Sequence, residues 1–325
     1  MHRHAGGLAN LGGTCYLNSV LQVLRSSDAL RLPSGHGQTE AEPALVAHVR
    51  SVLAELDAAE GRTVSPGALL QRLQGLAGPR FCIQQPNDLH EIYVRLIEWL
   101  TAAAQSTDRP PAPPSSEALD PEAQAAWSAC LQGSSGALLP SLYGMLRRDV
   151  RCGRCGATYT NHETFSALVL DVPPGDGPTP LSTVILAHFA ERDLNADGGT
   201  WKCDRCSATG APAWTSARMV HAPRVLTFAL NRYGGEGRDR GVSFPPALDL
   251  VGKGRYRCTG AALHVGGMTG GHCFAAAPRR GDGRWAMYDD ACVSELMGPP
   301  NGPQSCRDVQ LLTYVLNDAH LEKKE

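Results

Sequence analysis

Two pairs of cysteines with the same Cys-x-x-Cys spacing constrain the fold of this chain more than any other feature. The pairs are Cys152/Cys155 and Cys203/Cys206, with residues 156–202 between them. Each pair presents two thiolates to one tetrahedral ion, and two pairs complete a zinc site with zinc–sulfur bonds of about 2.3 Å. Four thiolates leave no open coordination position, so the sequence predicts a structural zinc ion. We expect the intervening segment to form a pair of strands and a helix.

Two other interpretations of these cysteines stay open at this stage. They could be ordinary buried thiols, or one pair could be redox-active. A thioredoxin-type pair lies between a strand and a helix in a βαβ unit, and the flanking sequence lacks that pattern. The identical spacing of the two pairs, and the basic residues within them, favour zinc.

The cysteine count also indicates the compartment. The chain has 11 cysteines, which cannot all pair with one another, and residues 1–7 lack the apolar core of a secretory signal. We therefore expect reduced thiols in the cytoplasm, with the nucleus as the alternative. The formal net charge of -2 gives no global reason to bind nucleic acid or an acidic membrane. The apolar runs are also far shorter than the roughly 20 residues that span a bilayer.

Helical periodicity dominates the first half of the chain, and strand-like runs dominate the second half. Apolar residues recur at i, i+3, i+4 and i+7 in segments 17–24, 45–56, 69–76 and 89–100. A Pro-rich and Ser-rich stretch, residues 105–122, indicates a linker. Strand-like runs follow, separated by Gly and Pro turns, at 167–172, 225–230, 261–265, 273–277, 285–288 and 311–316. This order predicts an α+β fold rather than alternating α/β units.

Among the remaining cysteines, Cys15 is the candidate nucleophile. Thr14 is the predicted N-cap of the first helix, which places Cys15 in the first turn. There the free backbone N–H groups and the helix dipole favour a thiolate. Without a partner base, a buried and inert thiol would be the simpler interpretation.

A predicted hairpin supplies that base. If the turn is centred between Arg280 and Gly281, His272 lies opposite Asp289, with Cβ atoms about 5 Å apart. Asp289 can then fix the tautomer of the His272 ring and leave the other nitrogen for the thiol. This is the Cys–His–Asp arrangement of a papain-like protease. In a regular strand, Asp290 would face the opposite side.

An oxyanion also needs a hydrogen-bond donor. Asn10 lies in the loop just before Cys15, and its amide could join the N–H groups of that loop. A turn residue in a Gly-rich loop is the competing interpretation of Asn10.

These segments together resemble a known family. Residues 7–22 closely resemble the cysteine box of ubiquitin-specific proteases, and 264–272 through Trp285, Tyr288 and Asp289 resemble their histidine box. Segments 225–233, 242–249 and 309–316 are similar to further family segments, and the cysteine pairs fall where the family places zinc. Cys273 is a departure, because an aromatic residue usually follows the histidine.

The resemblance implies a papain-like cysteine protease fold, α+β, with thumb, palm and zinc-bearing fingers in a single catalytic domain, 1–325. The thumb would be 1–140, the fingers 141–222 and the palm 223–325. By motif position Cys15 would be the nucleophile, His272 the general base and Asp289 the orienting acid. Asn10 would supply the oxyanion hole, and Asp290 could assist or substitute for Asp289.

The resemblance also implies a substrate-binding surface. Asp88 and Glu91 match the acidic positions that meet the arginines of the modifier's tail, although a helix start explains both equally simply. His264, a rival base without a matching acid, is placed with the substrate-binding residues. The Gly-rich segments 234–241 and 266–271 match loops that border the channel for the Gly-Gly tail.

The resulting hypothesis is a thiol-dependent isopeptidase that removes ubiquitin or a ubiquitin-like modifier from lysine side chains. Within the family, residues 81–96 and 263–265 look most like the interferon-induced member, which acts on an interferon-induced two-domain modifier and would point to innate immunity. The alternatives are a catalytically weak modifier-binding adaptor and a zinc-organised scaffold. We expect a monomer whose partners are the modifier and its conjugates, not nucleic acid or a membrane.

Overall fold

The structure is a computed structural model of the chain. It describes residues 6–27, 44–77, 87–103, 120–131, 139–196, 198, 200–232, 240–267, 270–280 and 282–317. Most of the predicted linker, most of the loop at 234–241, residues 268–269 and residues 81–86 lie outside these ranges.

Eight strands form the largest sheet. They are β5 (Leu168–Asp171), β9 (Val225–Asn231), β11 (Ala247–Leu250), β12 (Gly254–Gly267), β13 (Gly270–Pro278), β14 (Trp285–Asp289), β15 (Cys292–Glu295) and β16 (Val309–Leu316). The order is β15-β14-β13-β12-β16-β9-β5, and β11 pairs with β12. All neighbours are antiparallel except β5 and β9, which run parallel.

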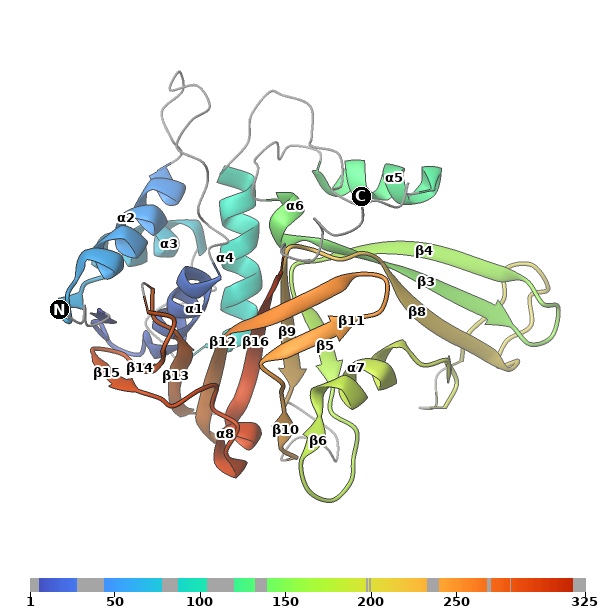
Figure 1. Cartoon of the computed structure of the whole chain (residues 1–325). Helices are drawn as coiled ribbons and strands as arrows, with labels where there is room; N and C mark the ends of the chain where they lie inside the picture. Colours follow the sequence, from blue (N-terminus) through green and yellow to red (C-terminus); the bar gives the residue numbers. More distant parts are fainter. Residues whose placement is uncertain are drawn as a thin grey trace, which may run out of the picture.

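Both faces of this sheet are covered. Four helices, α1 (Cys15–Ser26), α2 (Ala44–Ala58), α3 (Gly67–Ala77) and α4 (Leu89–Ala103), gather at one side of the molecule (Figure 1). Their apolar stripes form one core with residues of the sheet, and α7 (Leu181–Phe189) belongs to a second core that includes Leu226 and Phe228. Because β9 contributes to both cores, its first six residues are all buried, and all of them except Thr227 are apolar.

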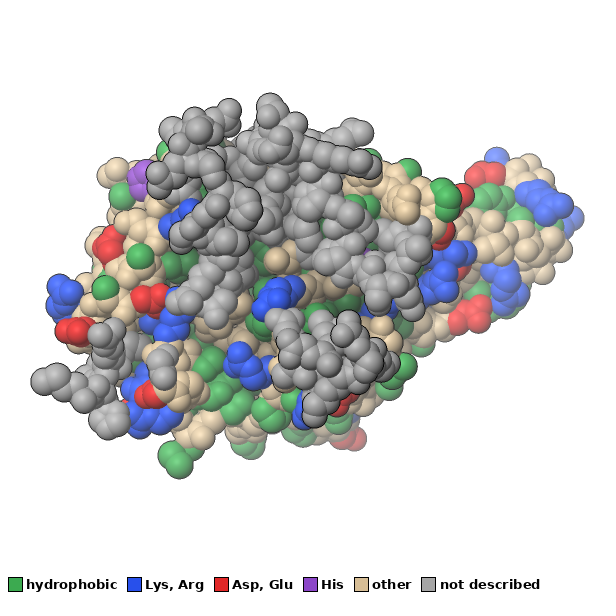
Figure 2. Space-filling model, turned by 45° about the horizontal axis from the view of Figure 1, so that its top comes forward, with side chains coloured by type: hydrophobic (Ala, Val, Ile, Leu, Met, Phe, Trp, Pro, Cys, Tyr) green, Lys and Arg blue, Asp and Glu red, His purple; other side chains and the backbone are tan. Residues whose placement is uncertain are grey.

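A second sheet of four strands projects away from these helices (Figure 1). We call it the arm; its strands are β3 (Gly144–Cys152), β4 (Thr158–Phe165), β7 (Arg192–Asp193) and β8 (Ala213–His221), in the order β4-β3-β8-β7. On the face shown in Figure 2, basic and acidic side chains are interspersed along the arm. Ion pairs on or next to the arm include Arg148–Glu163 and Arg151–Glu191.

The remaining elements are short, apart from one helix. They are β1 (Gly7–Leu8), β2 (Thr63–Val64), β6 (Thr179–Pro180), β10 (Val242–Ser243), α5 (Pro121–Leu131), α6 (Leu139–Leu142) and α8 (Pro303–Asp308). None of the helices within the described ranges combines the length and apolar composition needed to cross a bilayer.

Each predicted helical stripe lies on a helix, and each predicted strand-like run lies on a strand, which confirms the mixed helix-and-strand composition. Two local expectations are wrong. The segment between the cysteine pairs holds four strands and a helix, because β5 and β6 leave the arm for other sheets. The end of the predicted linker starts α5, where Asp120 caps the helix by accepting a hydrogen bond from the Ala123 N–H at 2.8 Å. The division into thumb, fingers and palm stays a prediction.

Candidate active site

Helix α1 begins at Cys15 and packs against strand β13. The loop before it turns through Gly12 and Gly13, whose φ angles of +94° and +74° favour glycine. Thr14 occupies the N-cap position, but its hydroxyl makes no capping hydrogen bond to the helix and instead accepts one from the Leu11 N–H at 3.0 Å. The prediction of Thr14 as the N-cap residue is therefore confirmed by position, while its hydroxyl stabilises the preceding loop rather than the helix end.

The surroundings of Cys15 favour its thiolate. The pKa of Cys15 falls to about 5, chiefly because the Cys273 thiol donates to it, with further contributions from the Cys273 backbone N–H and the charge of His272. Burial and the negative charge of Asp290 oppose this shift. At neutral pH the sulfur is therefore a nucleophilic thiolate rather than an inert thiol.

His272 and Asp289 are in direct contact. The Nε2 atom of His272 lies 2.5 Å from Oδ1 of Asp289. Burial of the ring works against protonation, but the hydrogen bond and charge of Asp289, with the thiolate of Cys15, raise the pKa of His272 above its usual value. The surroundings therefore favour the protonated form of the imidazole, with Nε2 engaged by the carboxylate.

The predicted strand register behind this contact is wrong by two residues. Strands β13 and β14 pair Ala275 with Tyr288 and Pro278 with Trp285, so the turn is centred one position later than predicted. The centre moves because the Arg279 N–H donates to the Arg284 carbonyl at 2.7 Å, which closes a four-residue loop. A two-residue shift keeps every side chain on its original face, so His272 still reaches Asp289 diagonally.

Asp290 lies on the same side as the histidine, contrary to prediction. Strand β14 ends at Asp289, and the backbone of Asp290 turns with a φ of +50°. Its carboxylate accepts hydrogen bonds from the amides of Asn10, at 2.9 Å, and Asn18, at 2.7 Å. The expectation of a regular strand fails at this turn.

Asn10 is fixed by both halves of its amide. Its Oδ1 accepts the N–H groups of Gly12 and Thr14 at 3.1 and 3.2 Å, as a turn residue would, while its Nδ2 donates to Asp290. An amide nitrogen carries two hydrogens. Within the described part of the chain, Asp290 accepts one of them, and the other is available to a ligand.

The predicted substrate-binding residues lie on or next to elements that neighbour the site formed by Cys15, His272 and Asp289. Asp88 and Glu91 line one cleft of about 330 Å³, together with Val169, Asn231 and Gln310. Asp88 also caps α4, because its Oδ1 accepts a hydrogen bond from the Glu91 N–H at 2.8 Å. The alternative interpretation of Asp88 as a helix-start residue is therefore correct for its structural role. His264 lies on β12 directly opposite Cys273.

Two participants were missed at the sequence level. The sequence analysis noted Cys273 only as a departure from the family pattern, yet its thiol donates a hydrogen bond to Cys15. Its position next to His272 in the sequence could have indicated this role. Asn18 is a buried polar residue on the apolar helix α1 that ties Asp290 to the Ala9 carbonyl, the latter at 3.2 Å. A polar side chain three positions after the nucleophile could have identified it.

The four paired cysteines converge at the end of the arm. The sulfur atoms of Cys152, Cys155, Cys203 and Cys206 all lie within 4.8 Å of one another, close enough to bind one metal ion. Two of the separations are 3.9 Å, for Cys152–Cys206, and 3.7 Å, for Cys155–Cys203. A tetrahedron with bonds of about 2.3 Å has edges of about 3.8 Å, so the spacing fits zinc.

The two cysteine loops share one backbone design. In the first, the Gly156 N–H donates to the Cys152 carbonyl at 2.9 Å, and in the second the Ser207 N–H donates to the Cys203 carbonyl at 2.8 Å. Both donors have positive φ, +70° for Gly156 and +54° for Ser207. These matched turns aim each cysteine pair at the same point.

Comparison with known proteins gives a consistent result. Residues 6–315 match the family described as ubiquitin carboxyl-terminal hydrolase. The chain is 27% identical to ubiquitin carboxyl-terminal hydrolase 23 of Arabidopsis thaliana, 26% to hydrolase 21 of Homo sapiens and 25% to hydrolase 11 of Schizosaccharomyces pombe, each over 89% of this chain. It spans only 33%, 58% and 78% of these relatives, respectively.

Proposed function

This chain belongs to the ubiquitin carboxyl-terminal hydrolase family, and from that premise we propose that it is a cysteine isopeptidase that removes ubiquitin from lysine side chains. The observation that carries the proposal is the polarised group at the start of α1. The Cys273 thiol and the charge of His272, whose ring is hydrogen-bonded to Asp289, lower the pKa of Cys15 to about 5. The mixed helix-and-strand fold fits the papain-like arrangement of such enzymes.

The proposed reaction has two steps. The Cys15 thiolate attacks the carbonyl carbon of the modifier's terminal glycine, and the bond to the lysine Nζ breaks as protonated His272 gives that nitrogen a proton. The product is a thioester and a free lysine amine. Neutral His272 then takes a proton from water, whose oxygen attacks the thioester and releases the modifier's carboxylate and the Cys15 thiolate.

Asn10 is the proposed donor to the developing oxyanion. Its amide is held from one side by Asp290 and from the other by the N–H groups of Gly12 and Thr14. A donor fixed before the reaction stabilises charge without reorganising, which is the property an oxyanion hole requires. Asp290 is thus proposed to act through Asn10 rather than in place of Asp289.

The cleft beside α4 is the proposed site for the modifier's tail. Asp88 and Glu91 would pair with arginines of that tail, and His264 would border the channel on β12. The relatives named above are hydrolases of ubiquitin by name, which favours ubiquitin. The interferon-induced modifier is the second candidate, because 263–265 resemble the member that acts on it.

The cysteine cluster is proposed to hold a structural zinc ion. Cys152 and Cys155 would hold it from one side, and Cys203 and Cys206 from the other. When bound, zinc would supply no chemistry to the active site and would join β3 to the loop before β8. Since both this site and Cys15 need reduced thiols, we place the protein in the cytoplasm or nucleus.

The proposed activity can be tested with a panel of modifier probes. Each probe carries an electrophile at the C-terminus of ubiquitin or of the interferon-induced modifier, and the wild-type protein is compared with Cys15→Ala. We expect a covalent adduct between wild-type Cys15 and the ubiquitin probe, and none for the variant. Binding of the probe without an adduct would instead support the adaptor interpretation.

A further inference from the structure

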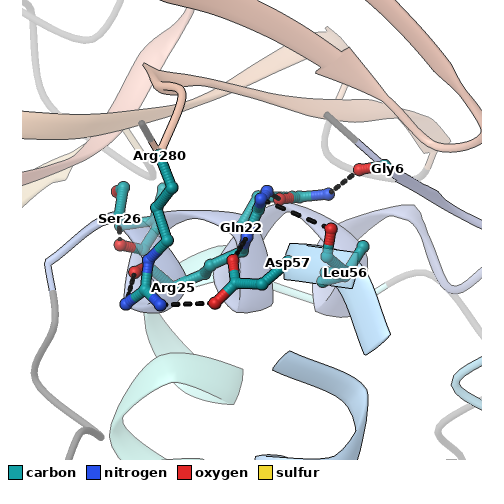
Figure 3. Close-up of polar contacts among 8 residues, drawn as sticks. Gly6, Gln22, Arg25, Ser26, Leu56, Asp57 and Arg280 are labelled. Carbon is teal, nitrogen blue, oxygen red and sulfur yellow. Dashed lines mark hydrogen bonds and ion pairs between the residues drawn. The ribbon is translucent and has the colours of Figure 1, made fainter. Parts of the chain in front are cut away.

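The helix and the hairpin that meet at the active site also meet at their opposite ends. Helix α1 runs from Cys15 to Arg25 within its last turn, a rise of about 15 Å. Strand β13 runs from His272 to the turn that contains Arg280, about 20 Å or more at 3.3 Å per residue. A side chain of α2, Asp57, lies where these far ends come together (Figure 3).

Asp57 bonds both elements at once. Its Oδ1 accepts the Arg25 Nε–H at 2.8 Å, and its Oδ2 accepts a hydrogen bond from the Arg280 guanidinium. Arg280 also donates to the backbone carbonyl of Arg25 at 3.3 Å. One carboxylate therefore fastens the end of the helix to the turn of the hairpin (Figure 3).

Burial makes this junction sensitive to the charge of Asp57. The Arg25 side chain is only 6% exposed, and those of Arg280 and Asp57 are 23% and 28% exposed. Arg25 also donates to Gln22 at 3.1 Å, and Gln22 in turn donates to the Gly6 carbonyl at 3.1 Å. Without the carboxylate, two guanidinium groups would face each other at a largely buried position, which pushes the helix and the turn apart.

We infer that Asp57 is a positioning residue for the proposed reaction: by holding Arg25 and Arg280, it sets the placement of Cys15 relative to His272. The two reacting side chains lie on different elements, α1 and β13. A displacement of about 1 Å at a reacting group can cost about a hundredfold in rate. The junction fixes the two elements at a second point, so their packing cannot pivot about the active site. This inference rests on the proposed function.

The test compares Asp57→Ala and Arg280→Ala with a matched control, Glu295→Ala. Glu295 pairs with Arg279, the neighbour of Arg280, but this pair stays within the β13–β15 region and does not reach α1. Each folded variant is assayed with a C-terminal fluorogenic amide of ubiquitin. The rate of alkylation of Cys15 by iodoacetamide is measured against pH in parallel.

We expect kcat to fall about tenfold or more in Asp57→Ala, with KM changed by less than about twofold. The alkylation profile of Cys15 moves to higher pH, because the thiolate loses part of its contact with protonated His272. Arg280→Ala gives the same pattern, and the double variant is no worse than the more affected single variant, because both act through one junction. Glu295→Ala leaves both readouts at wild-type values.

Two outcomes would overturn the inference. In the first, Asp57→Ala and Arg280→Ala lower the unfolding temperature while kcat and the alkylation profile stay unchanged. The junction would then be an ordinary ion pair that stabilises the fold without positioning Cys15. In the second, Glu295→Ala reproduces the effects of both variants. The effects would then come from a general loosening of the hairpin and not from the Asp57 junction. Alkylation needs no modifier, so it still tests the junction if ubiquitin proves not to be a substrate.

Discussion

Nε2 of His272 lies 2.5 Å from Oδ1 of Asp289, although the two residues do not face each other across the β13–β14 ladder. The contact runs diagonally from β13 to the last residue of β14. It raises the pKa of His272 against the burial of the ring, while the Cys273 thiol and the charge of His272 lower the pKa of Cys15 to about 5. The two shifts open a pH range in which thiolate and imidazolium coexist.

This range predicts a bell-shaped pH profile for hydrolysis. Activity should be lost as the pH falls through about 5, because the Cys15 thiolate is then protonated. It should also be lost as the pH rises past the raised pKa of His272, because neutral imidazole cannot protonate the leaving amine. Asp289→Asn should lower kcat by about 10²- to 10⁴-fold and move the alkaline limb to lower pH. An unchanged alkaline limb would contradict the assignment of Asp289.

Replacing Cys273 by alanine should raise the pKa of Cys15. The variant loses the thiol that donates to Cys15 but keeps the backbone N–H and the charge of His272. The acid limb of the profile should therefore move to higher pH, and the rate below that limb should fall about tenfold for each pH unit that the limb moves. Alkylation of Cys15 by iodoacetamide against pH measures this change directly. Cys306→Ala, at a buried cysteine on α8, is the control and should leave the profile unchanged.

Asp290→Asn should separate two effects of this carboxylate. Its negative charge raises the pKa of Cys15, so removing it should move the acid limb to lower pH. Its hydrogen bonds hold Asn10 and Asn18, so kcat should fall, but by less than the roughly 10²- to 10³-fold expected for Asn10→Ala. Measuring kcat and the alkylation profile together tests both. If Asp290→Asn moved the acid limb to higher pH, the charge of Asp290 would not raise the pKa of Cys15 as described.

The sequence predicted which residues interact better than it predicted their geometry. Cys15, His272 and Asp289 could be proposed as one group because a helix start and a strand–turn–strand pattern are local signals, and the structure shows the His272–Asp289 contact; their catalytic roles stay a proposal. The predicted strand register was wrong because hydrogen bonds within the turn determine it. The orientation of Asp290 was wrong because a positive φ at a single residue does not change the hydrophobic pattern of the sequence. The roles of Cys273, Asn18 and Asp57 depend on contacts between distant elements, which no local pattern encodes.

Metal removal should destabilise the arm without altering the nucleophile. Cys203→Ser removes one of the four converging thiols, so we expect less than one bound zinc per chain and a lower unfolding temperature. Each kcal/mol lost should lower that temperature by about 2–4 °C. Cys15 alkylation should be unaffected, since the cluster lies on the arm. Cys258 is a buried cysteine outside the cluster, so the Cys258→Ser variant should bind as much zinc as the wild type. Purified protein without metal would contradict the zinc proposal.

Asp88→Asn tests substrate binding apart from helix capping. Asparagine caps a helix about as well as aspartate, so the unfolding temperature should stay close to that of the wild type. The charge that would meet an arginine of the ubiquitin tail is lost, and KM for a ubiquitin amide should rise about three- to tenfold, the range for a partly exposed ion pair. Glu98→Gln, an exposed residue later in α4, is the matched control and should leave KM unchanged. Because Asp88 is only half-buried, salt screens an ion pair at this position, and the wild-type advantage over Asp88→Asn should shrink as salt is added. A salt-independent difference would mean that Asp88 acts through the helix rather than through the substrate.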